Sequence, residues 1–180
     1  MKLTRAFLLK IAVIWSCIAI GLLLVVPWLG WAMHLFRGNG IQLSGVFFTV
    51  PDRYFAHTSS DCRASMWRCN FGVPLCHAAY GFIEIVPHHD GRKIDLKRDL
   101  DRLKTILINQ EKLAGMNLLA QRKLDTKIGT VVCFQFNSEK RSNVSCFFDN
   151  SEITILYEGS ETFVGDVYEL VNSATWPNGK

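Results

Sequence analysis

Residues 95–115, DLKRDLDRLKTILINQEKLAG, give the clearest secondary-structure signal in the chain. Their apolar side chains recur every three or four residues and form one stripe of a helix, made of Leu96, Leu100, Leu103, Leu107 and Ala114. Asp95 is a good N-cap and Gly115 is a typical stop signal. The opposite face is charged. The pattern predicts an amphipathic helix that buries its stripe against a sheet.

Segments rich in β-branched and aromatic residues lie on both sides of this helix and predict strands. Two precede it and four follow it, at 43–50, 80–86, 118–124, 130–136, 144–148 and 153–157. Residues 52–78 are expected to be irregular, with short strands at most. A second amphipathic helix is expected at about 161–175, ended by Pro177. Short connections favour antiparallel pairing. The predicted fold class is α+β, an antiparallel sheet packed by two amphipathic helices, in a domain covering 42–177.

The layout resembles the PsbP-like fold, which includes small exported DcrB-like bacterial proteins. The matching features are Val50-Pro51 followed by Tyr54-Phe55, the long middle helix, the strand GTVVCFQF at 129–136, and a final helix ending VNSATW at 171–176. The resemblance covers about residues 42–176. It implies an accessory or binding role and brings no catalytic motif. Several bacterial immunity proteins against secreted toxins resemble the same fold, so a toxin-neutralising role is a second implication.

The N-terminal segment is apolar. Residues 11–33 form a run of 23 without a charged side chain. A helix of that length is about 35 Å long, enough to cross a hydrocarbon core of about 30 Å. Lys2, Arg5 and Lys10 precede the run, which places residues 1–10 in the cytoplasm by the positive-inside rule.

This segment predicts a transmembrane signal-anchor helix at 11–33, in contact with the bilayer, and a linker at 34–41. The predicted location is the inner membrane, crossed once, with the C-terminal domain in the periplasm. A cleaved signal peptide is the alternative, because Pro27 divides the run, and Gly30 and Ala32 are small residues two apart.

Charge is uneven along the chain, which has 20 Lys and Arg against 16 Asp and Glu. Residues 1–37 hold four basic side chains and no acidic one, so the rest is neutral overall. Nucleic-acid binding needs a positive excess on the folded domain, so no nucleic-acid partner is expected. Residues 92–127 hold ten basic and five acidic side chains, whereas 142–179 hold six acidic and none basic. Solvated helix faces explain this, or one pole docks a partner of opposite charge.

Five cysteines fall in the predicted exported part, where disulfides are the first interpretation. If a hairpin centres on Glu139-Lys140, Cys133 pairs with Cys146 and a bridge can form. If the register slips by one, Phe134 opposes Cys146 and the two sulfurs lie on opposite faces. The sequence leaves both registers open. A second bridge is expected within the remaining set of Cys62, Cys69 and Cys76.

Metal and nucleophile chemistry use the same residue types. The potential ligands are His57, Cys62, Cys69, Cys76, His77, His88 and His89. Gaps of six residues between the cysteines do not match the short spacing of structural zinc sites, so no metal site is expected. A Cys76–His88 nucleophile pair is conceivable, yet a bridged cysteine and a solvated histidine fit better.

No catalytic, cofactor-binding or metal-binding residue is therefore predicted. The expected function is that of a membrane-anchored extracytoplasmic protein-binding or accessory module that is not an enzyme, with toxin neutralisation as one form. A protein partner is expected. The alternative is a Cys-dependent or metal-dependent enzyme of the envelope.

Overall fold

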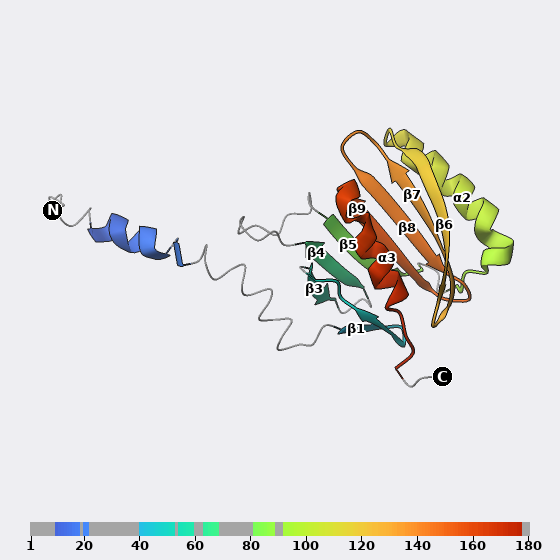
Figure 1. Cartoon of the computed structure of the whole chain (residues 1–180), viewed down its shortest axis with the longest axis horizontal. Coiled ribbons are helices and arrows are strands. Elements are labelled where there is room, and N and C mark those ends of the chain that lie inside the picture. Colours follow the sequence, from blue (N-terminus) through green and yellow to red (C-terminus); the bar gives the residue numbers. More distant parts are fainter. Residues whose placement is uncertain are drawn as a thin grey trace.

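A computed structural model describes residues 10–18, 20–21, 40–52, 54–59, 63–68, 81–88 and 92–177. A seven-stranded antiparallel sheet dominates it, and a separate two-stranded hairpin lies beside that sheet (Figure 1). The strands are β1 Gly40–Leu43, β2 Val46–Thr49, β3 Tyr54–Thr58, β4 Ala64–Arg68, β5 Gly81–Pro87, β6 Asn117–Thr126, β7 Gly129–Asn137, β8 Ser142–Phe148 and β9 Ile153–Gly159. The helical elements after residue 90 are α2 Leu96–Leu113, the 3-10 turn η1 Glu161–Phe163 and α3 Val164–Asn172. The large sheet has the order β3-β4-β5-β9-β8-β7-β6.

The predicted α+β class was wrong, because the structure is mostly β. Of the described residues 47% are in strands and 32% are helical. Much of the difference comes from the segment 52–78, expected to be irregular, which contributes β3 and β4 to the main sheet. The last helix is also shorter than the expected 161–175, because its first turn is 3-10 and its α-helical part ends at Asn172.

The expected strand 43–50 is a hairpin instead. Leu43 pairs with Val46 around a two-residue turn. Ser44 and Gly45 both have positive φ, 47° and 78°, which is the backbone that a tight hairpin turn of this kind requires. The hairpin also pairs with the C-terminal segment. The backbone N–H groups of Phe47 and Thr175 each donate a hydrogen bond to the other residue's carbonyl.

The N-terminal prediction also needs correction. Across the part of the chain that the structure describes, no helix is long and apolar enough to cross a membrane. A crossing needs about 20 helical residues, and the helical residues described there are only 10–18 and 20–21. The predicted single-pass anchor at 11–33 and the inner-membrane location were wrong on this finding. Residues 1–9 and 22–39, including most of the predicted linker, lie outside the described residues.

The two helices pack on opposite faces of the main sheet. Leu100, Leu103 and Leu107 of α2 pack against alternate residues of β7, such as Phe134 and Phe136. We call this side the α2 face. Val167, Leu170 and Val171 of α3 lie on the other side with Cys133, Ile83 and Ile155, and the β1–β2 hairpin extends that core. We call this side the α3 face. Because successive side chains of a strand point to opposite faces of the sheet, one set of side chains packs against α2 and the other against α3.

The long strand β6 forms one edge of the sheet. Its pairing with β7 shifts between Leu118 and Ala120, so Leu119 is the extra residue of a bulge and is 57% exposed. Arg122, Lys123 and Asp125 are exposed along the same strand. The opposite edge is the five-residue strand β3.

Candidate functional site: the open half of the sheet

Helix α2 covers only part of its face of the sheet. It packs over β6 and β7, at one end of the strand order. At the other end, β3, β4 and β5 lie away from α2, and no described helix packs on their α2 face (Figure 1). Residue burial follows this division. On β5 Ile83 and Ile85 are fully buried on the α3 face, whereas Phe82 and Glu84 are half-buried on the α2 face. We call this region, over which no described helix lies, the open half.

Three aromatic side chains cross the open half in one row. The strand registers place Phe55 of β3 opposite Trp67 of β4, and Trp67 opposite Phe82 of β5. The Phe55 and Trp67 rings are stacked with centroids 6.2 Å apart, and the Trp67 and Phe82 rings are tilted with centroids 5.8 Å apart. Cross-strand aromatic pairs of this kind stabilise a sheet, and all three residues are half-buried. We call Phe55, Trp67 and Phe82 the aromatic ladder.

A second row lies beside the ladder and contains an acid. His57, Ser65, Glu84 and Leu156 follow one another across four strands. Glu84 is half-buried, and within the described residues its carboxylate has no ion-pair partner. Its neighbours along β5 are Phe82 and Val86, so the carboxylate stands in mainly apolar surroundings. An acid in such a place attracts a cation more strongly than one in open solvent does.

The ladder row continues into a cleft. Beyond Phe82 the register leads to Glu158 of β9 and then to Asn143 of β8, and both residues line an open cleft of about 860 Å³ at the end of α2. Arg141 donates to the Glu158 carboxylate at 2.6 Å. The Asn143 amide donates to both carboxylate oxygens of Glu111 on α2, at 3.0 and 3.3 Å. The cleft and the ladder are therefore parts of one continuous surface.

A buried polar cluster on the α3 face holds the strands of the open half in place. Arg68 at the end of β4 donates to Asp166 of α3 at 2.7 Å, and its guanidinium lies 3.6 Å from the centre of the Phe163 ring. Only 12% of the Arg68 side chain is exposed, so this ion pair is more than a surface contact. It ties β4, and through it the ladder, to α3.

Two tyrosines complete the cluster. The Tyr157 hydroxyl donates to the carbonyl of Ser160 at 2.7 Å. Burial raises the pKa of both Tyr54 and Tyr157 well above the usual tyrosine value, and the nearby carboxylate of Asp166 raises the pKa of each further. Both hydroxyls therefore stay protonated in the folded protein and act as neutral packing groups.

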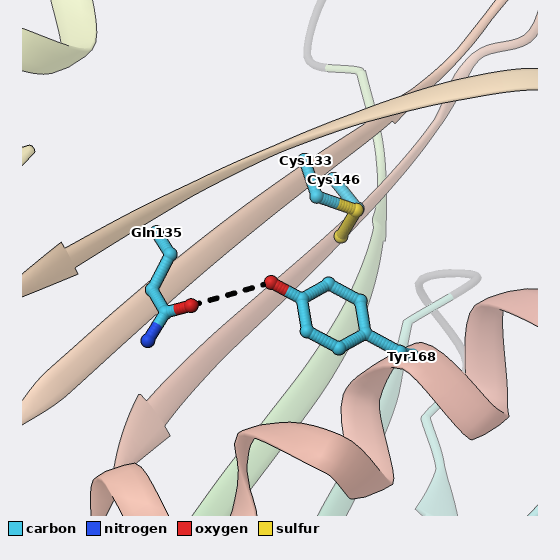
Figure 2. Close-up of a disulfide and its surroundings, with 4 residues drawn as sticks. All are labelled: Cys133, Gln135, Cys146 and Tyr168. Atoms are coloured by element: carbon cyan, nitrogen blue, oxygen red, sulfur yellow. Dashed lines mark hydrogen bonds between the residues drawn. A yellow bond between two sulfur atoms is a disulfide. The ribbon is translucent and has the colours of Figure 1, made fainter. Parts of the chain in front are cut away.

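Cys133 and Cys146 form a disulfide on the α3 face, with an S–S distance of 2.04 Å (Figure 2). The structure has the register centred on Glu139-Lys140, in which these two residues are directly opposite. Tyr168 of α3 donates to Gln135 beside the bridge at 3.4 Å. Both sulfur atoms are joined in the bridge and fully buried, so neither residue has a free thiol to act as a nucleophile. The bridge lies on the opposite face of the sheet from the ladder.

The other predicted residues are only partly placed. Cys62, Cys69, Cys76, His77 and His89 lie outside the described residues, so the second bridge stays a prediction. His57 lies exposed on β3 in the Glu84 row, and His88 follows β5. Among the residues that are described, no group of three or more His, Cys, Asp or Glu side chains could hold a metal ion.

The sequence interpretation missed the aromatic ladder. Phe55 and Trp67 both lie in the segment 52–78, which was expected to be irregular. The pairing of β3 with β4 was therefore not predicted. The alternation of Phe82, Glu84 and Val86 with Ile83 and Ile85 was the available signal that β5 has two different faces.

In comparisons with known proteins, no family model and no curated protein matches the chain. The resemblance to the PsbP-like fold therefore stays a prediction.

Proposed function

We propose that the protein is a binding module that docks a protein partner on the open half of its sheet. The observation that carries this proposal is the aromatic ladder on a sheet face that no described helix covers. Aromatic residues are enriched where proteins bind one another, because each ring supplies a large contact area with few rotatable bonds. The ladder presents three such rings on a rigid sheet.

Charge narrows the class of partner. Within the described part of the chain Glu84 is an unpaired acid beside the ladder, and Glu158 at the ladder's end is 54% exposed even though Arg141 pairs with it. Carboxylates at these positions repel phosphate groups, so the surface favours a protein that brings positive charge over a nucleic acid. Neutralisation of a secreted toxin is one form of such binding.

The proposal is tested by placing a photo-activated cross-linking amino acid at Phe55 in cells, with Thr162 as the matched control. Phe55 is at the edge of the ladder, and Thr162 is exposed on η1 beside α3. We expect a discrete protein cross-link from position 55 only. The purified partner should then bind Trp67→Ala at least about tenfold more weakly than the unchanged protein, as expected for an interface hot spot.

Equal cross-linking from both positions would overturn the proposal, as would unchanged affinity of the Trp67→Ala variant. Cross-linking of position 55 to glycans alone would overturn the choice of a protein partner. Circular dichroism of each variant establishes that it is folded.

A further inference from the structure

We infer that the partner inserts an arginine side chain between the aromatic ladder and Glu84. This inference rests on the proposed function, because it specifies the chemistry recognised on the same open half. It concerns one spot on that face, bounded by Trp67, Phe82 and Glu84.

The strand registers define this spot. Glu84 lies two residues after Phe82 on β5, so both side chains point to the same face. Trp67 of β4 is opposite Phe82, which makes it the diagonal cross-strand neighbour of Glu84. Diagonal neighbours have their backbones about 7–8 Å apart, within reach of large side chains. A group of guanidinium size bound there contacts the rings and the carboxylate together.

None of the cross-strand neighbours that the structure describes balances the charge of Glu84. Ser65 lies opposite it on β4 and Leu156 opposite it on β9. Neither carries charge, and the next residue in the row, His57, is one strand further away. Arg141, a cation that lines the adjoining cleft, is already paired with Glu158. A half-buried carboxylate without a counter-charge is stabilised when a partner supplies one.

Arginine fits this spot better than lysine does. Its planar guanidinium donates two parallel hydrogen bonds to one carboxylate and also stacks on an aromatic ring. It is less strongly hydrated than an ammonium group, so moving it onto a half-buried aromatic surface costs less. The protein already uses this combination internally, where Arg68 contacts both the Phe163 ring and the Asp166 carboxylate.

The test uses three fluorescent peptides of alternating serine with arginine, citrulline or lysine, titrated into the full chain. Citrulline keeps the shape of arginine and removes its charge. The arginine peptide should bind best. Glu84→Gln should weaken its binding on the order of tenfold, the usual size of a charge-assisted contact. Glu169→Gln, which removes the same charge from an exposed position on α3, should leave binding unchanged.

Three results would overturn the inference: equal binding of the citrulline peptide, equal binding of the lysine peptide, or equal behaviour of the two glutamine variants. Trp67→Ala separates this failure from failure of the proposed function. If Trp67→Ala weakens binding of the cross-linked partner and Glu84→Gln does not, the open half is the docking face but the arginine subsite is wrong. If neither substitution weakens it, both are wrong. Phe55→Ser at the sheet edge repeats the comparison should Trp67→Ala fail to fold.

Discussion

Gly81 of β5 and Gly159 of β9 lie directly opposite each other in the sheet, and two tyrosine hydroxyls occupy the space that their side chains would fill. A Cβ atom on Gly159 would lie 2.5 Å from the Tyr157 hydroxyl and 2.7 Å from the Cα of Gly81. The second contact is with backbone, which cannot rotate away. The buried cluster behind the open half therefore depends on the absence of a side chain here.

We predict that Gly159→Ala lowers the free energy of unfolding by about 1–3 kcal/mol, the usual cost of overpacking a core. Gly165→Ala is the matched control. Gly165 is an exposed residue inside α3 with no atom within 4 Å of an added Cβ, so alanine there should stabilise the protein by about 0.5–1 kcal/mol. Urea denaturation measures both variants. Effects of the same sign would contradict the packing described.

The disulfide should contribute to the free energy of unfolding by an amount similar to the effect of Gly159→Ala. Cys133 and Cys146 are separated by 13 residues in sequence. Closing a loop of this size restricts the unfolded chain and stabilises the folded one by about 3 kcal/mol. The double variant with alanine at both positions should unfold with a free energy lower by about 2–4 kcal/mol, in the same denaturant titration.

A dithiol reductant provides the control for that experiment. It should destabilise the unchanged protein by more than it destabilises the double variant, because only the unchanged protein has the Cys133–Cys146 bridge to lose. A loss smaller than 0.5 kcal/mol in the double variant would show that the bridge does not form in the protein.

Stability should fall at alkaline pH. Because the pKa values of Tyr54 and Tyr157 are raised in the folded state, their hydroxyls ionise only in the unfolded chain above about pH 10. The stabilisation is thus complete below pH 10 and declines as the pH rises, by about 1.4 kcal/mol per pH unit for each tyrosine. Unfolding free energies measured from pH 8 to 12 should show this slope.

Tyr157→Phe isolates one of the two groups. It should reduce the alkaline slope by about 1.4 kcal/mol per pH unit, the share of a single tyrosine hydroxyl. It should also lower the stability at neutral pH by about 1 kcal/mol through loss of the hydrogen bond to Ser160. An unchanged slope would mean that Tyr157 ionises as easily in the folded state as in the unfolded one.

Helix α2 offers a test of its packing. Leu103 is half-buried against β7, and Leu113, at the end of the same helix, is 92% exposed. Leu103→Ala should cost about 1–3 kcal/mol, below the range for full burial, whereas Leu113→Ala should change stability by less than about 0.5 kcal/mol. Thermal unfolding followed by circular dichroism compares them. Equal losses would mean that the helix packs on a different stripe.

The sequence predicted the segments with strong local signals. For α2, the apolar period and Asp95, whose carboxylate accepts hydrogen bonds from the backbone N–H groups of Lys97 and Arg98, located both the helix and its first turn. The β7–β8 hairpin was placed as well, although its register was left open. The register decides whether the sulfur atoms of Cys133 and Cys146 are close enough to bond. A shift of one residue leaves the composition of both strands unchanged, so composition could not choose between the two registers.

The candidate site was not predictable in the same way. Phe55, Trp67 and Phe82 become neighbours only through two strand pairings, and the strands that carry the first two are five residues long. Their sequences, YFAHT and ASMWR, do not alternate strictly between apolar and polar residues, so they lack the period of a half-buried strand. The turn at Ser44-Gly45 had a signal, because that dipeptide often marks a turn, yet the apolar residues on both sides suggested one continuous strand.

The bulge at Leu119 has a consequence for the protein at high concentration. A strand from a second molecule can extend a sheet only if it meets a regular row of free backbone groups, and the extra residue interrupts that row on β6. Arg122 and Lys123 add like charges that would meet across such a contact. At the other edge, β3 offers only five residues for pairing. Growth of the sheet into fibrils is therefore disfavoured at both edges, even though the sheet between them is rich in aromatic and β-branched residues.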